Sequence, residues 1–334
     1  MINLTQKKDQ LRLAVGFLIS FAAFAALIWF IDVREVLAAI KQVRLVWILP
    51  VLLLLLISLV TRAGAWRVIL QERISLWHSF LIVNAGYFVN TVLPFRIGEI
   101  ARAFLLRPAG FTFWEALPTI VLERMFDILF AVGLFLTGLP YALGFTQGSA
   151  YAYLMGGIVL TGLFFLVLLV RYQNPIFSWI ENISVPWEDR KKWLVEKLRF
   201  VLSGLVILNN PNQILRTFIG MILSWGLALA YQYILLRAFV PDAQIIWAVF
   251  TLGALALGVS VPSSPGNIGL YEASITLALS AFGVDQSLAF AYALTSHVLS
   301  LGMTTVFGAF ALVNQGYAIG DIWRYSIKQK KEME

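Results

Sequence analysis

The chain has 334 residues, of which 60% are hydrophobic and only 13% are charged, and it contains no cysteine. This composition excludes an ordinary soluble domain, and the lack of cysteine excludes disulfides, thiolate metal sites and cysteine nucleophiles. The net charge of +7 comes from basic clusters beside long apolar runs, which favours anionic lipid headgroups over nucleic acid as partners. We therefore predict an all-α polytopic membrane protein.

Several apolar runs are long enough to cross a bilayer, which takes about 20 residues of helix. Hydrocarbon offers the backbone no water, so such segments are helices or belong to a closed β-barrel. The run VLLLLLISLV at residues 51–60 lacks the alternation of a barrel strand, which leaves helices. We predict six full spans, at residues 13–31, 45–61, 116–138, 151–170, 214–236 and 287–313.

Basic residues give these spans a direction, because they concentrate on the cytoplasmic side of a membrane. They cluster at residues 7–12, 62–73, 96–107, 190–199 and 324–331. We therefore predict a multi-pass protein of the cytoplasmic membrane with both termini in the cytoplasm. The first span is expected to be retained, because no small-residue cleavage site follows it. The segment 32–44 would then face the outside despite its basic residues.

Two segments, 76–107 and 246–283, do not fit this scheme, because each must leave one side of the membrane and return to it. They turn at similar strings, PFRIGE at residues 94–99 and PGNIGLYE at residues 265–272. Their flanking spans run in opposite directions, so we predict two re-entrant helical hairpins arranged as an inverted-topology repeat. In transporters, interrupted segments in matching positions mark a substrate site near the midplane.

The predicted repeat units are residues 45–138 and 214–313, within a single membrane domain of residues 1–334. The segment 172–213 connects them on the cytoplasmic side. From Pro186 onward its apolar residues recur at helical spacing and its charged residues avoid that face, which predicts an amphipathic helix on the membrane surface. Its expected role is that of a linker.

Three ionisable residues stand inside the span predicted at 116–138, where charge is costly unless it faces the bundle interior and a partner. Glu123 and Asp127 share one helix face, and Arg124 lies three residues before Asp127. Either these side chains belong to an internal polar site, or they snorkel to the interface.

The first hairpin carries Arg96, Glu99 and Arg102, which are spaced three apart and would form a ladder on a helix. A guanidinium matches phosphate oxygens in a bidentate way, which favours contact with an anionic headgroup. The alternative is that the arginines are only the basic cluster of a short loop.

The second hairpin places Ser264, Gly266 and Asn267 just before a predicted helix, whose backbone N–H groups and positive dipole end would attract an anion. Glu272 lies in the first turns of that helix, where the helix dipole stabilises a carboxylate. The alternatives are that Glu272 pairs with a cationic group or carries a proton. Asn90 occupies the matching place ahead of the first hairpin's turn.

Known catalytic and metal-binding motifs are missing from the sequence. The chain has two histidines, His78 and His297, which fall short of a zinc site. We expect His297, which stands mid-span beside Ser296, to be a hydrogen-bonded packing residue rather than a proton relay. There is no P-loop, no Gly-x-Ser-x-Gly and no H-E-x-x-H motif. We predict no catalytic residue, no metal and no cofactor.

The strings LPFRIGEIARAFLL, ERMFDIL and PSSPGNIGLYEA, in this order, resemble the lysylphosphatidylglycerol synthase transmembrane family, a flippase-like membrane domain. The family's P-x-R-x-G-E-x-x-R motif falls on Pro94, Arg96, Gly98, Glu99 and Arg102. Its E-R-x-x-D motif falls on Glu123, Arg124 and Asp127. Its P-G-G-x-G-x-x-E motif falls on Pro265, Gly266, Gly269 and Glu272, with Asn267 replacing one glycine and Tyr271 standing where an arginine is common.

This resemblance implies two re-entrant hairpins that meet in the membrane and the movement of a lipid between leaflets. Few residues follow the last predicted span, so we expect neither an aminoacyl-transferase domain nor lysylphosphatidylglycerol synthesis. We predict a translocase for an anionic phospholipid or a polyprenyl-phosphate-linked lipid.

Two alternatives stay open, an integral membrane enzyme acting on lipid phosphates and an accessory subunit of envelope lipid or glycan synthesis; a homo-oligomer is also left open. The predicted substrate-binding residues are Asn90, Arg96, Glu99, Arg102, Glu123, Arg124, Asp127, Ser264, Gly266, Asn267 and Glu272. The predicted hairpin turns contain Pro94, Gly98, Pro265 and Gly269.

Overall fold

The computed structural model describes residues 32–93, 96–145, 172–182, 210–261 and 264–333, with scattered positions between 150 and 195. Every regular element in these ranges is a helix, which confirms the all-α prediction for this part of the chain. The predicted span 13–31 lies outside the described residues. The span 151–170, the amphipathic helix after Pro186 and the turn residue Pro94 lie wholly or largely outside them.

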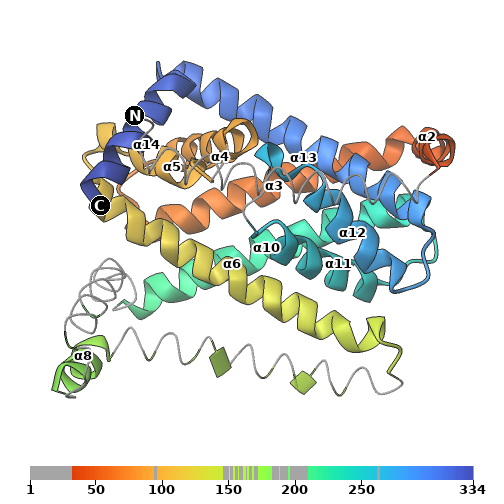
Figure 1. Ribbon diagram of the computed structural model, residues 1–334, viewed down its shortest axis with the longest axis horizontal. Coiled ribbons are helices and arrows are strands. Elements are labelled where there is room, and N and C mark those ends of the chain that lie inside the picture. Colours follow the sequence, from red (N-terminus) through yellow and green to blue (C-terminus); the bar gives the residue numbers. More distant parts are fainter. Residues whose placement is uncertain are drawn as a thin grey trace, which may run out of the picture.

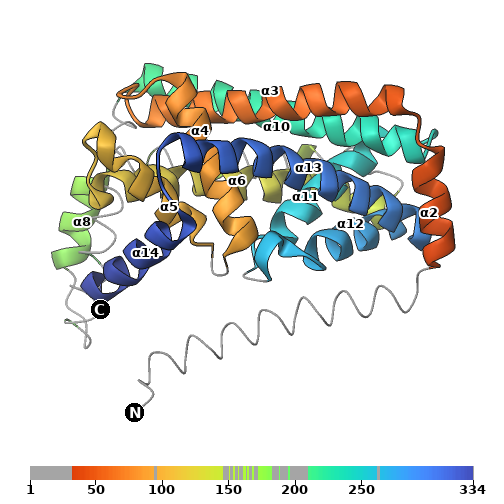
Figure 2. The ribbon, with the colours of Figure 1, turned by 90° about the horizontal axis from the view of Figure 1, so that it is seen from above.

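The four longest helices, α3, α6, α10 and α13, run roughly along the longest axis of the molecule (Figure 1). The short helices α2 and α14 lie at its opposite ends (Figure 2). The α-helices in chain order are α2 (Val33–Gln42), α3 (Leu45–Ile69), α4 (Leu76–Val92), α5 (Gly98–Leu105), α6 (Phe113–Ala142), α8 (Gln173–Asn182), α10 (Pro211–Phe239), α11 (Ile245–Gly258), α12 (Leu270–Ser280), α13 (Gln286–Asn314) and α14 (Ile319–Met333). Two 3₁₀ turns, η1 (Arg107–Ala109) and η3 (Pro265–Asn267), interrupt them.

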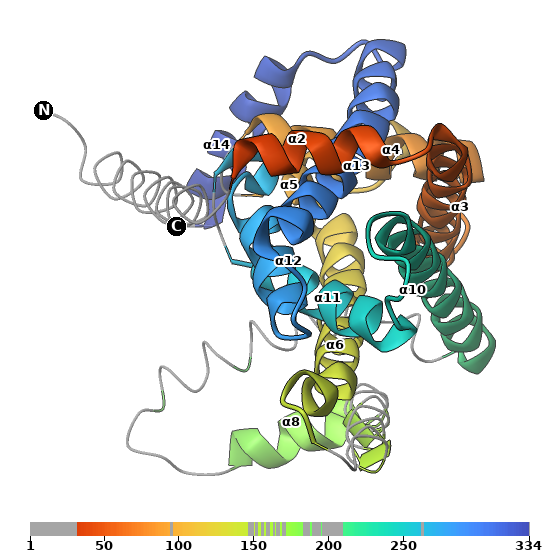
Figure 3. The same ribbon diagram turned by 90° about the vertical axis from the view of Figure 1, so that its right-hand side faces the viewer.

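Three of the described helices are long and apolar enough to cross a membrane, and they cover the spans predicted at 45–61, 214–236 and 287–313. Within α3, α10 and α13 these stretches are Val46–Ile69, Asn212–Phe239 and Gln286–Asn314. The span predicted at 116–138 falls within α6, a helix of 30 residues that carries the charged residues of that segment. Viewed end-on, α3 and α10 lie side by side at one edge of the bundle (Figure 3).

Contacts between helix ends show which segments lie together at each end of the molecule. At one end, Glu72, just after α3, pairs with Arg216 near the start of α10 at 2.6 Å. At the other end, the backbone N–H of Asp32, before α2, donates to the hydroxyl of Ser287 at the start of α13 (3.4 Å). Segments that the basic clusters assign to one side of a membrane therefore lie at the same end of the molecule.

The segments 76–107 and 246–283 each fold as two short helices joined by a turn. In the first, α4 ends at Val92 and α5 begins at Gly98; in the second, α11 ends at Gly258 and α12 begins at Leu270. The two turns meet in the middle of the molecule (Figure 2), where a Cβ atom on Gly266 would lie 3.6 Å from the Thr91 methyl carbon. The fold thus brings the two repeated strings together.

Small residues let α6 and α11 approach closely, as is common where membrane helices pack. A Cβ atom on Gly253 would lie 2.3 Å from the backbone nitrogen of Phe135, and one on Gly138 would lie 2.4 Å from the Phe250 Cβ. The rings of Phe135 and Phe250 stack beside this contact, with centroids 5.0 Å apart. The contact fixes the second helix pair against α6.

Replacing Gly253 with alanine is expected to cost about 1–3 kcal/mol of stability, because the added methyl meets backbone that must shift. Thermal unfolding of the purified protein in detergent would measure the loss. Gly302 in α13 is the matched control, because a Cβ atom there meets nothing within 4 Å. Alanine at that position should leave the unfolding temperature unchanged or raise it, so equal losses in both variants would contradict the packing argument.

Candidate functional site

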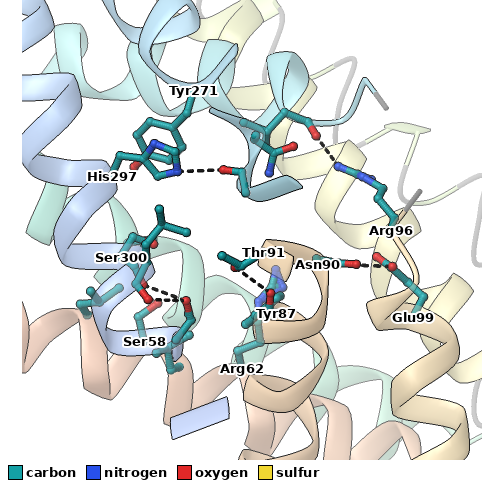
Figure 4. Close-up of a pocket in the computed structure, with 18 of the residues that line it drawn as sticks. Ser58, Arg62, Tyr87, Asn90, Thr91, Arg96, Glu99, Tyr271, His297 and Ser300 are labelled. Carbon is teal, nitrogen blue, oxygen red and sulfur yellow. Dashed lines mark hydrogen bonds between the residues drawn. The ribbon is translucent and has the colours of Figure 1, made fainter. Parts of the chain in front are cut away.

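A cavity of about 310 Å³ lies between the two turns. Helices α3 and α4 and the first turn form one wall, while η3, α12 and α13 form the facing wall (Figure 4). The polar and aromatic residues that line it include Ser58, Arg62, Tyr87, Asn90, Thr91, Arg96, Glu99, Arg124, Tyr231, Ser264, Asn267, Tyr271, His297, Ser300 and Thr304. Its size is at the lower end of the range for small-molecule sites.

The first turn is held by Asn90 and aims Arg96 across the cavity. The Asn90 side chain accepts a hydrogen bond from the backbone N–H of Gly98 (2.7 Å) and donates to Glu99 (3.4 Å). The guanidinium of Arg96 donates to the carbonyl oxygen of Val259, at the end of α11. One side chain therefore links the two helix pairs.

The two turns share an uncommon backbone conformation at the same motif position. Arg96 has φ +54° and Asn267 has φ +56°, and each is the third residue of its P-x-x-I-G string. A non-glycine residue in this left-handed region costs roughly 1–2 kcal/mol, and such residues cluster at functional sites. The shared conformation places Arg96 and Asn267 as counterparts on opposite walls of the cavity.

An ion-pair network supports the first wall. Asp127 on α6 accepts hydrogen bonds from Arg62 on α3 (2.8 Å) and from the indole N–H of Trp225 on α10 (3.2 Å), and it forms an ion pair with Arg124 at 3.2 Å. Arg124 also lies 3.6 Å from a carboxylate oxygen of Glu99. The network joins α3, α5, α6 and α10, so the charges of α6 face the bundle interior.

Arg102 and Glu123 form a fully buried pair behind this wall, which Arg62 joins to the network at 3.4 Å from Glu123. The exposed fraction is 1% for Arg102 and 0% for Glu123, and the two side chains are in ion-pair contact. The Arg102 guanidinium also lies over the Trp66 ring, 4.0 Å from its centroid. Arg102 does not line the cavity, because Glu123 and Trp66 occupy its charged group.

The arginines of this region outnumber its carboxylates by one, since Glu99, Glu123 and Asp127 accompany Arg62, Arg96, Arg102 and Arg124. Among the described residues, Arg96 alone in this set has no ion-pair partner. Its guanidinium faces the cavity while bound to a neutral carbonyl. The first wall of the cavity thus carries one positive charge more than its carboxylates balance.

On the facing wall, Glu272 and His297 form a buried pair. A Glu272 oxygen lies 2.6 Å from Nδ1 of His297, and the other oxygen accepts from the N–H of Gly269 (2.8 Å). Nε2 of His297 lies 2.9 Å from the carbonyl oxygen of Gly266. Tyr271 stacks on the imidazole, with ring centroids 4.0 Å apart.

A model of the lysylphosphatidylglycerol synthase TM region matches residues 13–308. The chain belongs to this family. It is also similar to UPF0104 membrane proteins of two archaea. One from Archaeoglobus fulgidus is 24% identical over 294 residues, covering 80% of this chain and 86% of the relative. One from Methanocaldococcus jannaschii is 22% identical over 226 residues, covering 66% of this chain and 92% of the relative. No solved structure matches the chain.

The structure divides the residues predicted for the site into two groups. The cavity is lined by Asn90, Arg96, Glu99, Arg124, Ser264, Gly266 and Asn267. Behind its walls lie Arg102, Glu123, Asp127 and Glu272. Gly98 is the first residue of α5, Gly269 is the N-cap residue of α12, and Pro265 opens η3.

Two further residues of this chain belong to the site, although they were not among the residues predicted to bind substrate. Arg62 stands in a basic cluster at the end of a predicted span, which indicated only the side of the membrane. His297 was expected to be a hydrogen-bonded packing residue, and it is buried and hydrogen-bonded to Glu272 and Gly266; it also lines the cavity, which was not expected. Its only sequence signal was its place in the middle of an apolar span. Within the described residues, no cluster of three metal-ligating side chains occurs.

Proposed function

We propose that the protein moves an anionic lipid between the two leaflets of the cytoplasmic membrane. The headgroup would bind in the cavity between the two turns while the acyl chains stay in the bilayer. The single observation that carries this proposal is Arg96, a guanidinium without an ion-pair partner among the described residues, exposed to a cavity inside a membrane-protein fold. Such a charge is costly in hydrocarbon, and an anionic phosphate relieves that cost by bidentate binding.

In this proposal the two helix pairs are re-entrant hairpins. The longest of their helices, α4, has 17 residues, and α5, α11 and α12 have 8, 14 and 11. At 1.5 Å per residue, α4 extends about 25 Å, less than the roughly 30 Å of a hydrocarbon core. Together with α6 and the predicted spans 13–31 and 151–170, the three clear spans complete six crossings, with both termini in the cytoplasm.

The inverted repeat is supported by the backbone as well as by the strings. Arg96 and Asn267 hold the same motif position and the same left-handed conformation, and their turns meet tip to tip. Sites of this kind lie near the midplane in transporters built from inverted repeats. In this proposal the cavity lies near the midplane, on the path of a headgroup between the leaflets.

Each charged group then has a separate role. Arg96 would bind the phosphate directly, with Asn267 and Ser264 as polar partners on the facing wall. Arg62 and Arg124, whose charges Asp127 and Glu99 balance, would line the first wall without adding a net charge that traps the anion. Arg102 and Glu123 would hold α5 against α6.

Reconstitution in phosphatidylglycerol vesicles tests the proposal. Fluorescent anionic lipid in the inner leaflet should become accessible to a membrane-impermeant quencher, and a zwitterionic phosphatidylcholine probe should do so more slowly. Equal, protein-independent rates for both probes would contradict a translocase. Mass spectrometry of the same vesicles should show unchanged lipid; a new product would instead indicate an enzyme acting on lipid phosphate.

A further inference from the structure

The contacts of the His297 ring nitrogens determine how many protons the ring and Glu272 must hold between them. The carbonyl oxygen of Gly266 can only accept, so Nε2 of His297 must carry a hydrogen to bind it at 2.9 Å. Nδ1 then faces a Glu272 oxygen at 2.6 Å, and that contact also needs a hydrogen. The exposed fractions of Glu272 and His297 are only 2% and 4%, which leaves little room for water to intervene.

Glu272 and His297 therefore hold two protons between them. Either both ring nitrogens are protonated beside a carboxylate, or a protonated carboxyl donates to a neutral ring. Both arrangements hold one proton more than an ionised glutamate beside a neutral histidine. Without that proton, one of the two contacts would set a lone pair against a lone pair.

We propose that Glu272 and His297 form a proton-binding site whose bound proton fastens the η3 turn to α13. The inference rests on the proposed function in one respect, because it makes the proton a co-substrate of lipid transfer. Loss of the proton leaves the remaining hydrogen on Nδ1, where the carboxylate is the stronger acceptor. Nε2 then releases the carbonyl of Gly266, and the turn that faces Arg96 becomes free to move.

The surroundings suit such a site. Tyr271 on α12 stacks on the ring and donates to Ser296 (2.9 Å), which in turn donates to Gln232 on α10 (3.1 Å). An aromatic face stabilises an imidazolium through its quadrupole. The titratable and charged groups on the elements around the pair are Tyr271 on α12, Tyr292 on α13, Tyr231 on α10 and, across the cavity, Tyr87, Arg62, Arg96, Glu99 and Arg124.

The two walls of the cavity would thus bind opposite charges. Arg96 receives the anionic phosphate, and the facing pair receives a proton. A proton entering together with an anion keeps the charge inside the membrane low, which lowers the cost of burying both. Because Gly266 and His297 both line the cavity, a headgroup there contacts the turn that the proton holds.

Nitrogen NMR of the full chain in nanodiscs tests the site without any lipid transfer. The sequence has two histidines, so histidine-selective labelling gives signals from His78 and His297 alone. His78 is exposed on α4 and serves as the reference, and the His78→Gln variant isolates the His297 signals. At neutral pH we expect two ring protons on His297, or one ring proton together with an infrared band of a protonated carboxyl that is lost in Glu272→Gln.

A singly protonated His297 beside an ionised Glu272 in the native protein would overturn the proposal. The variant Glu272→Gln should leave His297 with a single ring proton, and its thermal unfolding reports whether it is folded. Because the decisive spectra come from the native sequence, the test stays valid even if a variant misfolds.

The coupling is tested in phosphatidylglycerol vesicles with an imposed pH gradient. Transfer of the anionic probe should change severalfold with the gradient in the native protein, and not in Glu272→Gln. An unchanged native rate would overturn the proton's role as co-substrate. The two proposals fail separately. A pair that holds two protons without lipid movement removes only the translocase, and lipid movement with a singly protonated His297 beside an ionised Glu272 removes only the proton site.

Discussion

Glycine in place of Arg96 is expected to slow lipid transfer roughly ten- to hundredfold while leaving the protein about as stable as the native chain. The variant removes the cavity's uncompensated charge, and losing a charge-assisted hydrogen bond of about 1.5–3 kcal/mol corresponds to a roughly ten- to hundredfold slower transfer. It also loses the bond to the Val259 carbonyl but relieves the left-handed backbone of Arg96. The vesicle assay measures the first effect, and thermal unfolding measures the second.

Alanine at the same position separates the effect of the lost charge from the effect of the backbone strain. Arg96→Ala should transfer lipid as poorly as Arg96→Gly but unfold more easily, by about 1 kcal/mol, because alanine keeps the strain that glycine relieves. Arg96→Lys should retain part of the activity, since it keeps the charge without the planar fork. Arg34→Gln, on the exposed surface of α2, is the control and should behave as the native chain. Full activity in Arg96→Gly would refute the assigned role.

Replacing Arg102 with methionine should destabilise the protein by about 3–5 kcal/mol, because it leaves the buried carboxylate of Glu123 without its closest partner. Arg62, at 3.4 Å from Glu123, compensates only part of that charge. We therefore expect a large fall in the unfolding temperature and in the yield of folded protein. This is a structural role, in contrast to that of Arg96.

The double variant Arg102→Met with Glu123→Leu provides the contrast. Removing both buried charges should recover most of the lost stability, since an apolar pair of similar volume often matches a buried ion pair. The exposed pair of Arg324 and Asp321 on α14 is the control, with Arg324 side chain 77% exposed. Arg324→Met should change stability by no more than about 1 kcal/mol. A stable Arg102→Met protein would show that the pair does not hold α5 to α6.

Features with a local physical cause could be predicted from the sequence. Long uncharged runs gave helices at α3, α10 and α13, because lipid allows the backbone little else. The strings at residues 94–99 and 265–272 predicted helix breaks, since proline, glycine and charge together disfavour a continuous apolar helix, and the breaks lie there. The proximity of the two turns was expected from the resemblance and from opposite directions of the flanking spans.

Features that depend on pairing across the bundle could not be predicted in the same way. Spacing grouped Arg96 with Arg102, but only the packing of α5 on α6 decides that Arg102 meets Glu123 while Arg96 meets the cavity. The proton demand of His297 needs the carbonyl of Gly266 and the carboxylate of Glu272 on both sides of one ring. No sequence pattern encodes that coincidence.

A density map of the full-length protein in nanodiscs rich in phosphatidylglycerol would test the central claim most directly. We expect headgroup density inside the cavity, in contact with the Arg96 guanidinium and facing the η3 turn, with acyl chains leading back to the bilayer. A map in which the two turns lie on opposite surfaces, or in which lipid headgroups bind only outside an empty cavity, would contradict the account.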